Sequence, residues 1–223
     1  MLRLRARPML WFLAGLVLQS CAGLGGEPPV TSYLLSAAMP PAGIHRSSGR
    51  TLLVSPPRSA AGYDRPQIAY VRRAPRIDYY AHNQWADEPA RMLEPILIGA
   101  LEAGGGLRSV LGAASGLPAD LRLDTEVLAL HHEVAGAAGR GRIVLRVQLV
   151  DLGRGEVLAT RHFDRAVPAN SQDAPGGVAA INAALQDLLP QLVAFVNANV
   201  LHPPASIRPQ RSDRQRKVGK KPP

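Results

Sequence analysis

The sequence predicts an α+β fold, a single domain in which a mostly antiparallel sheet is packed against two helices on one face. Between residues 121 and 167, three long stretches alternate apolar with polar residues and are joined by glycine-rich connectors, as antiparallel strands are. Two other stretches, 84–101 and 174–200, carry apolar residues at helical spacing. One sheet covered by two helices is enough for one hydrophobic core.

The first 20 residues predict a secretory signal peptide. Three arginines precede the apolar run 9–18, and the small residue Ser20 stands at the cleavage position. This run of ten residues is too short for a transmembrane helix, which needs about 20. Cys21 follows directly, and it is the single cysteine of the chain. One thiol forms no disulfide within the chain, so its position carries the information.

The order Leu18-Gln19-Ser20-Cys21 resembles the bacterial lipobox. The resemblance implies that Cys21 is acylated, with palmitate among its chains, and becomes the first residue of the mature protein. Three acyl chains hold a protein on a membrane, since each buried methylene contributes about 0.8 kcal/mol. Ala22 in place of an aspartate points to the outer membrane, with the protein facing the periplasm. A buried free cysteine in a first helix is the alternative.

The net charge of +9 is placed at the two ends of the chain. The leader contributes +3 and the residues from Arg208 onward +6, so residues 21–207 are neutral. Residues 21–31 are expected to form a lipidated flexible tether, and residues 204–223 a disordered basic tail. Contact of this tail with anionic lipid is the alternative to a solvated tail. The compartment disfavours nucleic acid as a partner.

The domain is expected to span residues 32–203. Its first half is predicted to form strands followed by a helix. Strands are expected at 32–37, 51–55, 67–73 and 76–82. Ala74-Pro75 joins the last two as a hairpin. The helix is expected from Gln84 to Leu101, with Trp85 on its apolar stripe and Pro89 in its first turn. Pro95 is expected to kink or restart it.

The second half reads as an edge strand, a meander and a long helix. The edge strand is expected at 107–112. The meander strands are expected at 121–134, 142–152 and 156–167. Five residues of the first meander strand are expected on one face: Leu121, Leu123, Thr125, Val127 and Ala129. The helix 174–200 should cover the sheet, with Asp173 as its N-cap, Pro175 in its first turn and a kink at Pro190.

Residues 52–101 carry a more specific pattern. An apolar strand is followed by the loop Tyr63-Asp64-Arg65-Pro66-Gln67-Ile68, two further strands, and Asn83-Gln84-Trp85-Ala86-Asp87 opening a helix. This pattern resembles the ABC-type transport auxiliary lipoproteins, the PqiC-like family, and the likeness spans roughly residues 30–200. It implies an outer-membrane lipoprotein that serves an MCE-type system moving lipids or other hydrophobic molecules across the envelope. The implied role is docking rather than catalysis.

Five residues are candidates for that docking: Tyr63, Asp64, Arg65, Pro66 and Trp85. The first four fall in a loop between predicted strands, and loops tied to a rigid sheet often carry recognition. A local turn that fixes strand register explains Asp64-Arg65-Pro66 equally well. For Trp85, a core anchor packed on the sheet is favoured over an exposed contact.

No catalytic residue, metal site or cofactor is assigned from the sequence. His131 and His132 are adjacent in a predicted strand, so they should point to opposite faces and cannot chelate one ion together. Ser115 lacks the G-x-S-x-G frame of a nucleophile elbow. The glycines at 104–106 are not followed by the lysine and hydroxyl of a phosphate-binding loop.

The sequence therefore favours a non-enzymatic, lipid-anchored accessory component of an MCE/ABC-type transport system. Its expected partners are an MCE-type protein and the outer membrane. A homo-oligomer is left open. The first alternative is a stand-alone structural or assembly lipoprotein of the outer membrane. The second is a periplasmic hydrolase whose catalytic residues come together only in the fold.

Overall fold

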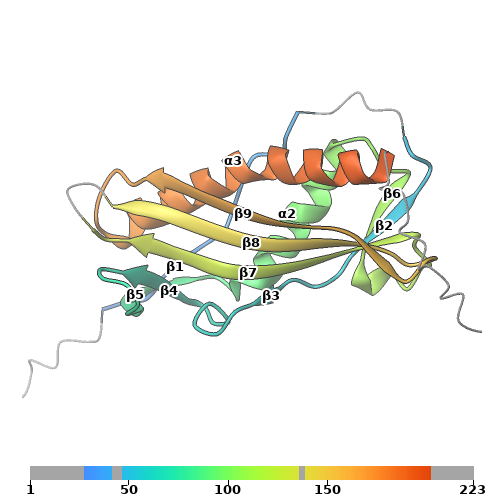
Figure 1. Ribbon diagram of the computed structural model, residues 1–223. Coiled ribbons are helices and arrows are strands. Elements are labelled where there is room, and N and C mark those ends of the chain that lie inside the picture. The colour runs from blue at the N-terminus through green and yellow to red at the C-terminus, as the bar shows by residue number, and fades with distance from the viewer. Residues whose placement is uncertain (1–27, 42–46, 136–138, 202–223) are drawn as a thin grey trace, which may run out of the picture.

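A computed structural model describes residues 28–41, 47–135 and 139–201 of the chain (Figure 1). The expected signal peptide 1–20, the acylation site Cys21, most of the tether 21–31 and the tail 204–223 lie outside these residues.

Within the described residues, nine strands form one sheet, and two helices pack against it. In chain order the elements are β1 (Thr31–Tyr33), β2 (Thr51–Val54), β3 (Arg58–Ser59), β4 (Gln67–Val71), β5 (Asp78–Trp85), α2 (Pro89–Ala103), β6 (Ser109–Gly112), a 3-10 turn (Ala113–Ser115), β7 (Leu121–Glu133), β8 (Arg140–Asp151), β9 (Glu156–Pro168) and α3 (Ala174–Leu201).

The sheet is built on β7, which pairs with four other strands along its two edges. Along one edge, β8 pairs with it antiparallel, from Leu121 opposite Asp151 to Glu133 opposite Arg140, and β9 follows β8 antiparallel. Along the other edge, β2, β3 and β4 pair with β7 one after another, and each pair is parallel. β6 and β1 add parallel pairs to β2 and β5.

The sheet is therefore mixed, and the expectation of a mostly antiparallel sheet was wrong. The meander and the β4–β5 hairpin are antiparallel, as predicted. The parallel pairs join segments far apart in the chain, such as Leu52 and Leu121. Alternation of apolar residues shows which face of a strand is buried, but it does not show the direction of the neighbouring strand. Parallel neighbours need a long crossover, and here the crossover contains α2.

A bulge in β7 changes which residues face the core. Leu121, Leu123, Thr125 and Val127 are buried, as predicted. The register then shifts at Leu128, and beyond this point Leu130 is buried in place of the expected Ala129. An extra residue in one strand moves every later side chain to the other face.

The helix α2 begins at Pro89 rather than at the expected Gln84, because residues up to Trp85 belong to β5. Pairing with β1 on one side and β4 on the other keeps this stretch extended. The helix α3 begins as predicted, since the Asp173 carboxylate accepts a hydrogen bond from the Gly176 amide (3.0 Å). Each helix is continuous through its internal proline, Pro95 or Pro190.

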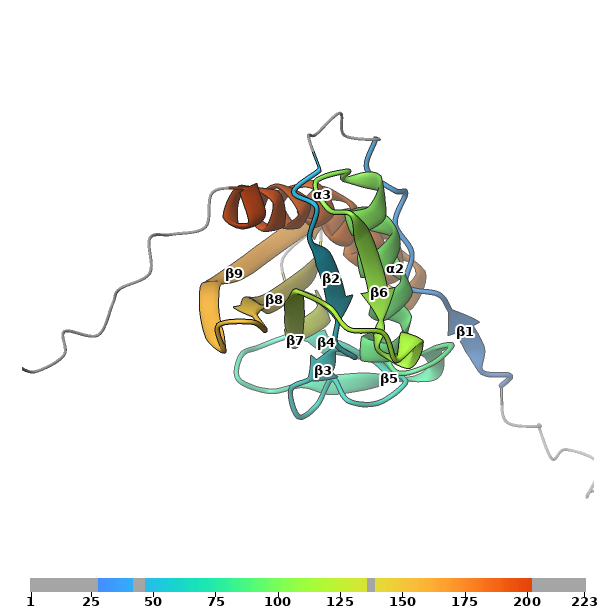
Figure 2. The same cartoon turned by 90° about the vertical axis from the view of Figure 1, so that its right-hand side faces the viewer.

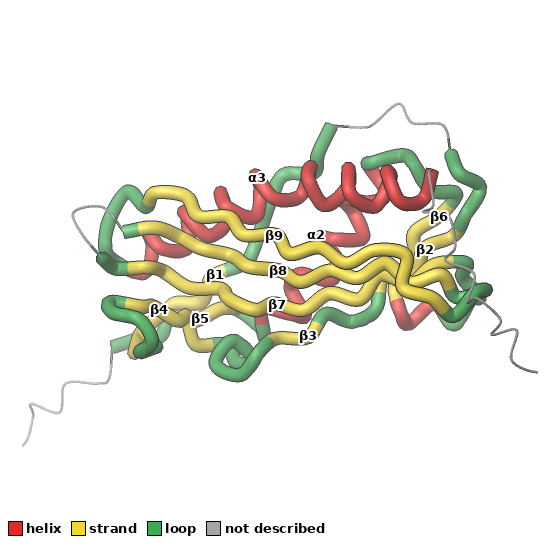
Figure 3. Tube along the Cα trace, viewed as in Figure 1, coloured by secondary structure: helices red, strands yellow, loops and turns green. Residues whose placement is uncertain are grey.

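One hydrophobic core lies between the sheet and the helices. The helix α3 runs along β7, β8 and β9, while α2 packs near β2 and β6, so the curved sheet closes around both helices (Figures 1, 2 and 3). Phe163 of β9 meets Phe195 of α3 edge to face at 5.8 Å. By length and composition α3 could cross a membrane, but most of its large apolar side chains are buried in this core.

The segment after β1 lies on α3 instead of continuing as the strand expected at 32–37. Asn182 of α3 accepts a hydrogen bond from the Ser36 amide (3.1 Å) and donates one to the Leu34 carbonyl (3.2 Å). The Ala38 amide donates to the side chain of Gln186. Helix side chains therefore satisfy backbone groups that a neighbouring strand would otherwise pair.

Candidate functional site

The loop between β3 and β4 holds four of the five candidate docking residues. The Gly62 amide donates to Asp64 Oδ1 (3.2 Å), which makes Asp64 part of a local turn. The Arg65 guanidinium lies 3.7 Å from the same oxygen and stacks over the Tyr79 ring at 5.3 Å from its centre. The side chains of Asp64 and Arg65 are about half exposed, at 53% and 50%. These contacts hold the turn in a defined conformation, with one acidic and one basic side chain facing outward.

Pro66 and Trp85 meet at the base of this loop. The Trp85 amide donates to the Pro66 carbonyl at 2.7 Å. The Trp85 side chain is only 1% exposed and belongs to the core. Trp85 is therefore a core anchor. It supports the loop and offers no surface to a partner.

Tyr63 ties the loop to β7. Its hydroxyl lies 2.9 Å from His131 Nδ1, and the two rings stack at 5.9 Å. Burial raises the pKa of the Tyr63 hydroxyl, as does nearby Tyr79, so the group stays protonated and able to hydrogen-bond. The loop is thus held at both ends, by Tyr63 and by Pro66, while Asp64 and Arg65 stay accessible.

A polar network extends from His131 across three strands. His131 Nε2 lies 3.7 Å from Glu133 Oε1. Glu133 accepts hydrogen bonds from Arg140 (2.8 Å) and Arg142 (3.0 Å), and Arg142 also pairs with Asp164 at 2.6 Å. Burial opposes ionisation of Glu133, but the hydrogen bonds from Arg142 and Arg140 outweigh it and lower the pKa of the carboxyl. Hydrogen bonds from Arg142 likewise lower the pKa of Asp164.

Sequence reasoning missed this network, although a signal for it was present. His131 and Glu133 are two residues apart on one strand, and Arg140 and Arg142 are two apart on the next. Each pair shares a face of its strand, and opposite charges across neighbouring strands attract. The connector between β7 and β8 is short, so the pairing register of these two strands could have been predicted from the sequence.

His132 lies on the other face of the sheet, as expected for a neighbour of His131. It is fully buried and packs so closely on α3 that a Cβ on Gly177 would lie 2.6 Å from its ring. Its Nδ1 lies 2.8 Å from the Tyr80 hydroxyl. Burial first, and then the charge of Asp173, raises the pKa of Tyr80 to about 12. The described residues contain no group of three His, Cys, Asp or Glu side chains placed to hold a metal ion.

Because both histidines are buried, we predict that the protein loses stability as the pH falls. Burial lowers the pKa of His131 and of His132 below the ordinary 6.5. Just below pH 6.5 the unfolded chain therefore binds protons that the folded chain does not. The free energy of unfolding should fall through this range, by up to about 1.4 kcal/mol for each pH unit by which a pKa is lowered.

An NMR titration of the imidazole carbons, with denaturant unfolding at about pH 7.5 and about pH 5.5, measures this effect. Midpoints for His131 and His132 at or above 6.5 would contradict it.

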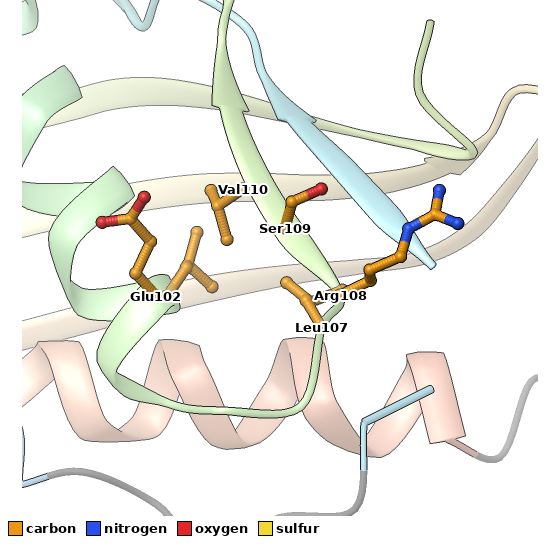
Figure 4. A pocket seen from close by; sticks show the side chains of 6 residues that line it. Glu102, Leu107, Arg108, Ser109 and Val110 are labelled. Carbon is orange, nitrogen blue, oxygen red and sulfur yellow. The ribbon is translucent and has the colours of Figure 1, made fainter. Parts of the chain in front are cut away.

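A separate pocket of about 310 Å³ lies between the end of α2 and β6 (Figure 4). Glu102 and Arg108 line it from opposite sides, with Ser109 between them. Arg108 donates to the Thr51 hydroxyl (2.8 Å), and the Ser109 hydroxyl also bonds to Thr51 (3.0 Å). The Ser109 hydroxyl thus bonds another hydroxyl here rather than a general base.

Comparisons with known proteins agree with this fold. The sequence model of the family described as ABC-type transport auxiliary lipoprotein component matches residues 33–193. The crystal structure of protein XCC0632 from Xanthomonas campestris has a TM-score of 0.67 and 26% identity, covering 74% of this chain and 94% of that one. An uncharacterized protein has a TM-score of 0.59 and 15% identity, covering 75% and 99%, which shows a shared fold. Among curated proteins, none matches this chain significantly.

Proposed function

The chain belongs to the family of ABC-type transport auxiliary lipoprotein components, and from this premise we propose that it is a lipid-anchored accessory component of an MCE-type envelope transport system. The system transports a lipid or another hydrophobic molecule. This protein acts in it by docking rather than by catalysis. Cys21 carries the acyl anchor, which holds the protein on the outer membrane facing the periplasm.

The observation that carries the proposal is the match of the family over residues 33–193, behind a cysteine at position 21 that follows a signal-peptide pattern. The match runs from the last residue of β1 into α3 and spans every described element between them. Only nine residues separate Cys21 from Thr31, where β1 begins. An anchor at Cys21 therefore keeps the domain near the membrane.

The loop at Tyr63–Pro66 supports docking by its construction. Both of its ends are fixed, by the Tyr63–His131 contact and by the Pro66–Trp85 hydrogen bond. A fixed loop loses little conformational entropy when it binds a partner. Asp64 and Arg65 face outward and offer the partner one charge of each sign.

The double substitution Asp64→Asn and Arg65→Gln is expected to weaken copurification with the transport component at least about tenfold, because charged contacts at an interface steer and fix partners. Fold stability should change by less than about 1 kcal/mol, as is usual for an exposed ion pair. Affinity purification of the tagged protein from its own membranes, with quantitative mass spectrometry, measures the effect.

The pair Glu88 and Arg91 provides a matched control. It has the same separation of 3.7 Å and is also exposed, but it lies at the start of α2. Glu88→Gln with Arg91→Gln should leave the association unchanged. Equal recovery of the transport component with both double variants would show that the loop is not the docking surface. If the unaltered protein brings down no transport component at all, the stand-alone structural lipoprotein becomes the better hypothesis.

A further inference from the structure

The tip of the β4–β5 hairpin forms a basic hollow that the docking role does not use. This hollow, of about 410 Å³, is lined by Tyr70, Arg72, Arg73, Ala74, Pro75, Arg76 and Asp78. It therefore gathers three guanidinium groups and one carboxylate. Residues 72–76 are all exposed.

Two of these arginines lack an acidic partner in the described part of the chain. Arg76 pairs with Asp78 at 2.9 Å, which accounts for the one carboxylate. Arg72 lies over the Tyr70 ring, 5.3 Å from its centre, and neither Arg72 nor Arg73 forms an ion pair with a described carboxylate. The tip thus holds two adjacent exposed positive charges that no described carboxylate neutralises.

The neighbouring arginines at this end of the sheet do have acidic partners. Arg140 and Arg142 are both bound to Glu133, and Arg142 also to Asp164. Val71, the last residue of β4, pairs with Glu133, so the hairpin tip extends beyond the end of β7. The uncompensated charge is therefore concentrated at the projecting tip and is not a property of the whole end.

The register of β1 directs the N-terminal end of the described chain toward this tip. β1 pairs parallel with β5, with Thr31 opposite Asn83 and Tyr33 opposite Trp85. The chain that precedes Thr31 consequently enters from the side of Asp78 and the hairpin, and Figure 1 shows β1, β4 and β5 at one end of the molecule. The chain from Cys21 to Thr31, with nine residues in between, reaches at most about 35 Å when extended. A membrane that holds Cys21 lies within reach of the tip.

The C-terminal end of α3 lies at the opposite end of the molecule. Asn197 bonds to the Gly104 carbonyl beside β6, whereas α3 starts next to the hairpin end of the sheet (Figure 1). Leu201, the last residue of α3, therefore lies far from the tip.

We propose that Arg72 and Arg73, supported by Arg76, bind the phosphate groups of anionic phospholipids in the membrane that holds the anchor. The planar guanidinium group matches the oxygens of a phosphate and is less strongly hydrated than an ammonium group. The contact would fix the orientation of the domain on the bilayer, so that the transport partner meets one defined face. This inference rests on the proposed function, because acylation at Cys21 places the tip at the membrane.

The test places a fluorophore at the tip of the full-length protein. Ala74→Cys is labelled with an environment-sensitive dye, and the protein is reconstituted in vesicles of phosphatidylethanolamine and phosphatidylglycerol that carry a headgroup quencher. The label at position 74 should be quenched. A label at Glu156→Cys, the first residue of β9 at the far end of the sheet, should not be.

The charge variant Arg72→Gln with Arg73→Gln should return the quenching at position 74 to the level of the far label. Each basic residue near an anionic surface strengthens binding roughly fivefold, so loss of both weakens the contact by up to about 25-fold. Lys220→Gln with Lys221→Gln removes the same charge from the C-terminal residues and should leave the quenching unchanged.

A label at position 74 that stays unquenched in these vesicles, or quenching that survives the loss of both arginines, would overturn the inference. The mass of the N-terminal peptide, measured on the same sample, reports separately whether Cys21 is acylated. An acylated protein with an unquenched tip leaves the proposed function intact and removes only the hairpin contact. If Cys21 is unmodified, the proposed anchor fails, and the hairpin contact, which rests on that anchor, fails with it.

Discussion

Replacement of Trp85 by alanine is expected to reduce the free energy of unfolding by about 3–5 kcal/mol, the range for truncation of a large buried aromatic residue. The side chain is 1% exposed and ends β5, where its amide also bonds to Pro66. Truncation leaves a cavity below the loop at Tyr63–Pro66, so the loop should lose order together with the core.

Urea unfolding followed by circular dichroism measures this change. Trp85→Phe keeps most of the buried area and should cost clearly less than the alanine variant. The exposed Val157→Ala, at a residue that is 54% exposed, should change the free energy by less than about 0.5 kcal/mol. A loss below about 1 kcal/mol for Trp85→Ala would show that this residue is not the anchor of the core.

Replacement of Gly141 by alanine should destabilise the protein by about 3 kcal/mol, at the upper end of the usual cost of overpacking. A Cβ at Gly141 would lie 2.2 Å from the Ile181 amide nitrogen and 2.3 Å from the Ala180 carbonyl carbon. Both atoms belong to the backbone of α3, which cannot rotate away as a side chain can. The helix would have to move off β8, and α3 covers the length of the meander.

Gly153→Ala is the matched control for this substitution. Its Cβ would meet only Asp151 Oδ1, at the ordinary contact distance of 3.5 Å. Thermal and denaturant unfolding of the two variants should therefore differ strongly. If both variants unfold alike, then α3 does not lie against β8 as closely as the structure shows.

The parts of the fold that depend on neighbouring residues could be predicted from the sequence. The meander, the hairpin around Ala74-Pro75 and the Asp173 cap of α3 each follow from patterns a few residues long. The mixed character of the sheet could not be predicted in this way. It depends on β2, β3 and β4 returning to β7 about 60 to 70 positions away, and no local pattern specifies which partner a strand takes.

Two local errors have the same origin. Gln84 and Trp85 fit a helical stripe, but pairing with β1 and β4 keeps them in β5. Ala129 fits the alternation of β7, but the bulge at Leu128 buries Leu130 instead. In both places, contacts with distant strands override a pattern read from a few residues.

Only the exposed part of the candidate site was predicted. The Tyr63–Pro66 loop was placed correctly between two strands. Its attachment to His131, 68 positions further along the chain, appears only when β4 pairs with β7. The uncompensated pair Arg72 and Arg73 was likewise hidden, because the sequence of the hairpin does not show that Asp78 pairs with Arg76.

The most direct test of the proposed role is purification of the protein in detergent from its own membranes, followed by mass spectrometry of the N-terminal peptide and of the copurifying proteins. The proposal predicts a triacylated Cys21 as the first residue and an MCE-type transport component in the same sample. An unmodified Cys21 would contradict the anchor, and an acylated Cys21 without any transport component would contradict the accessory role.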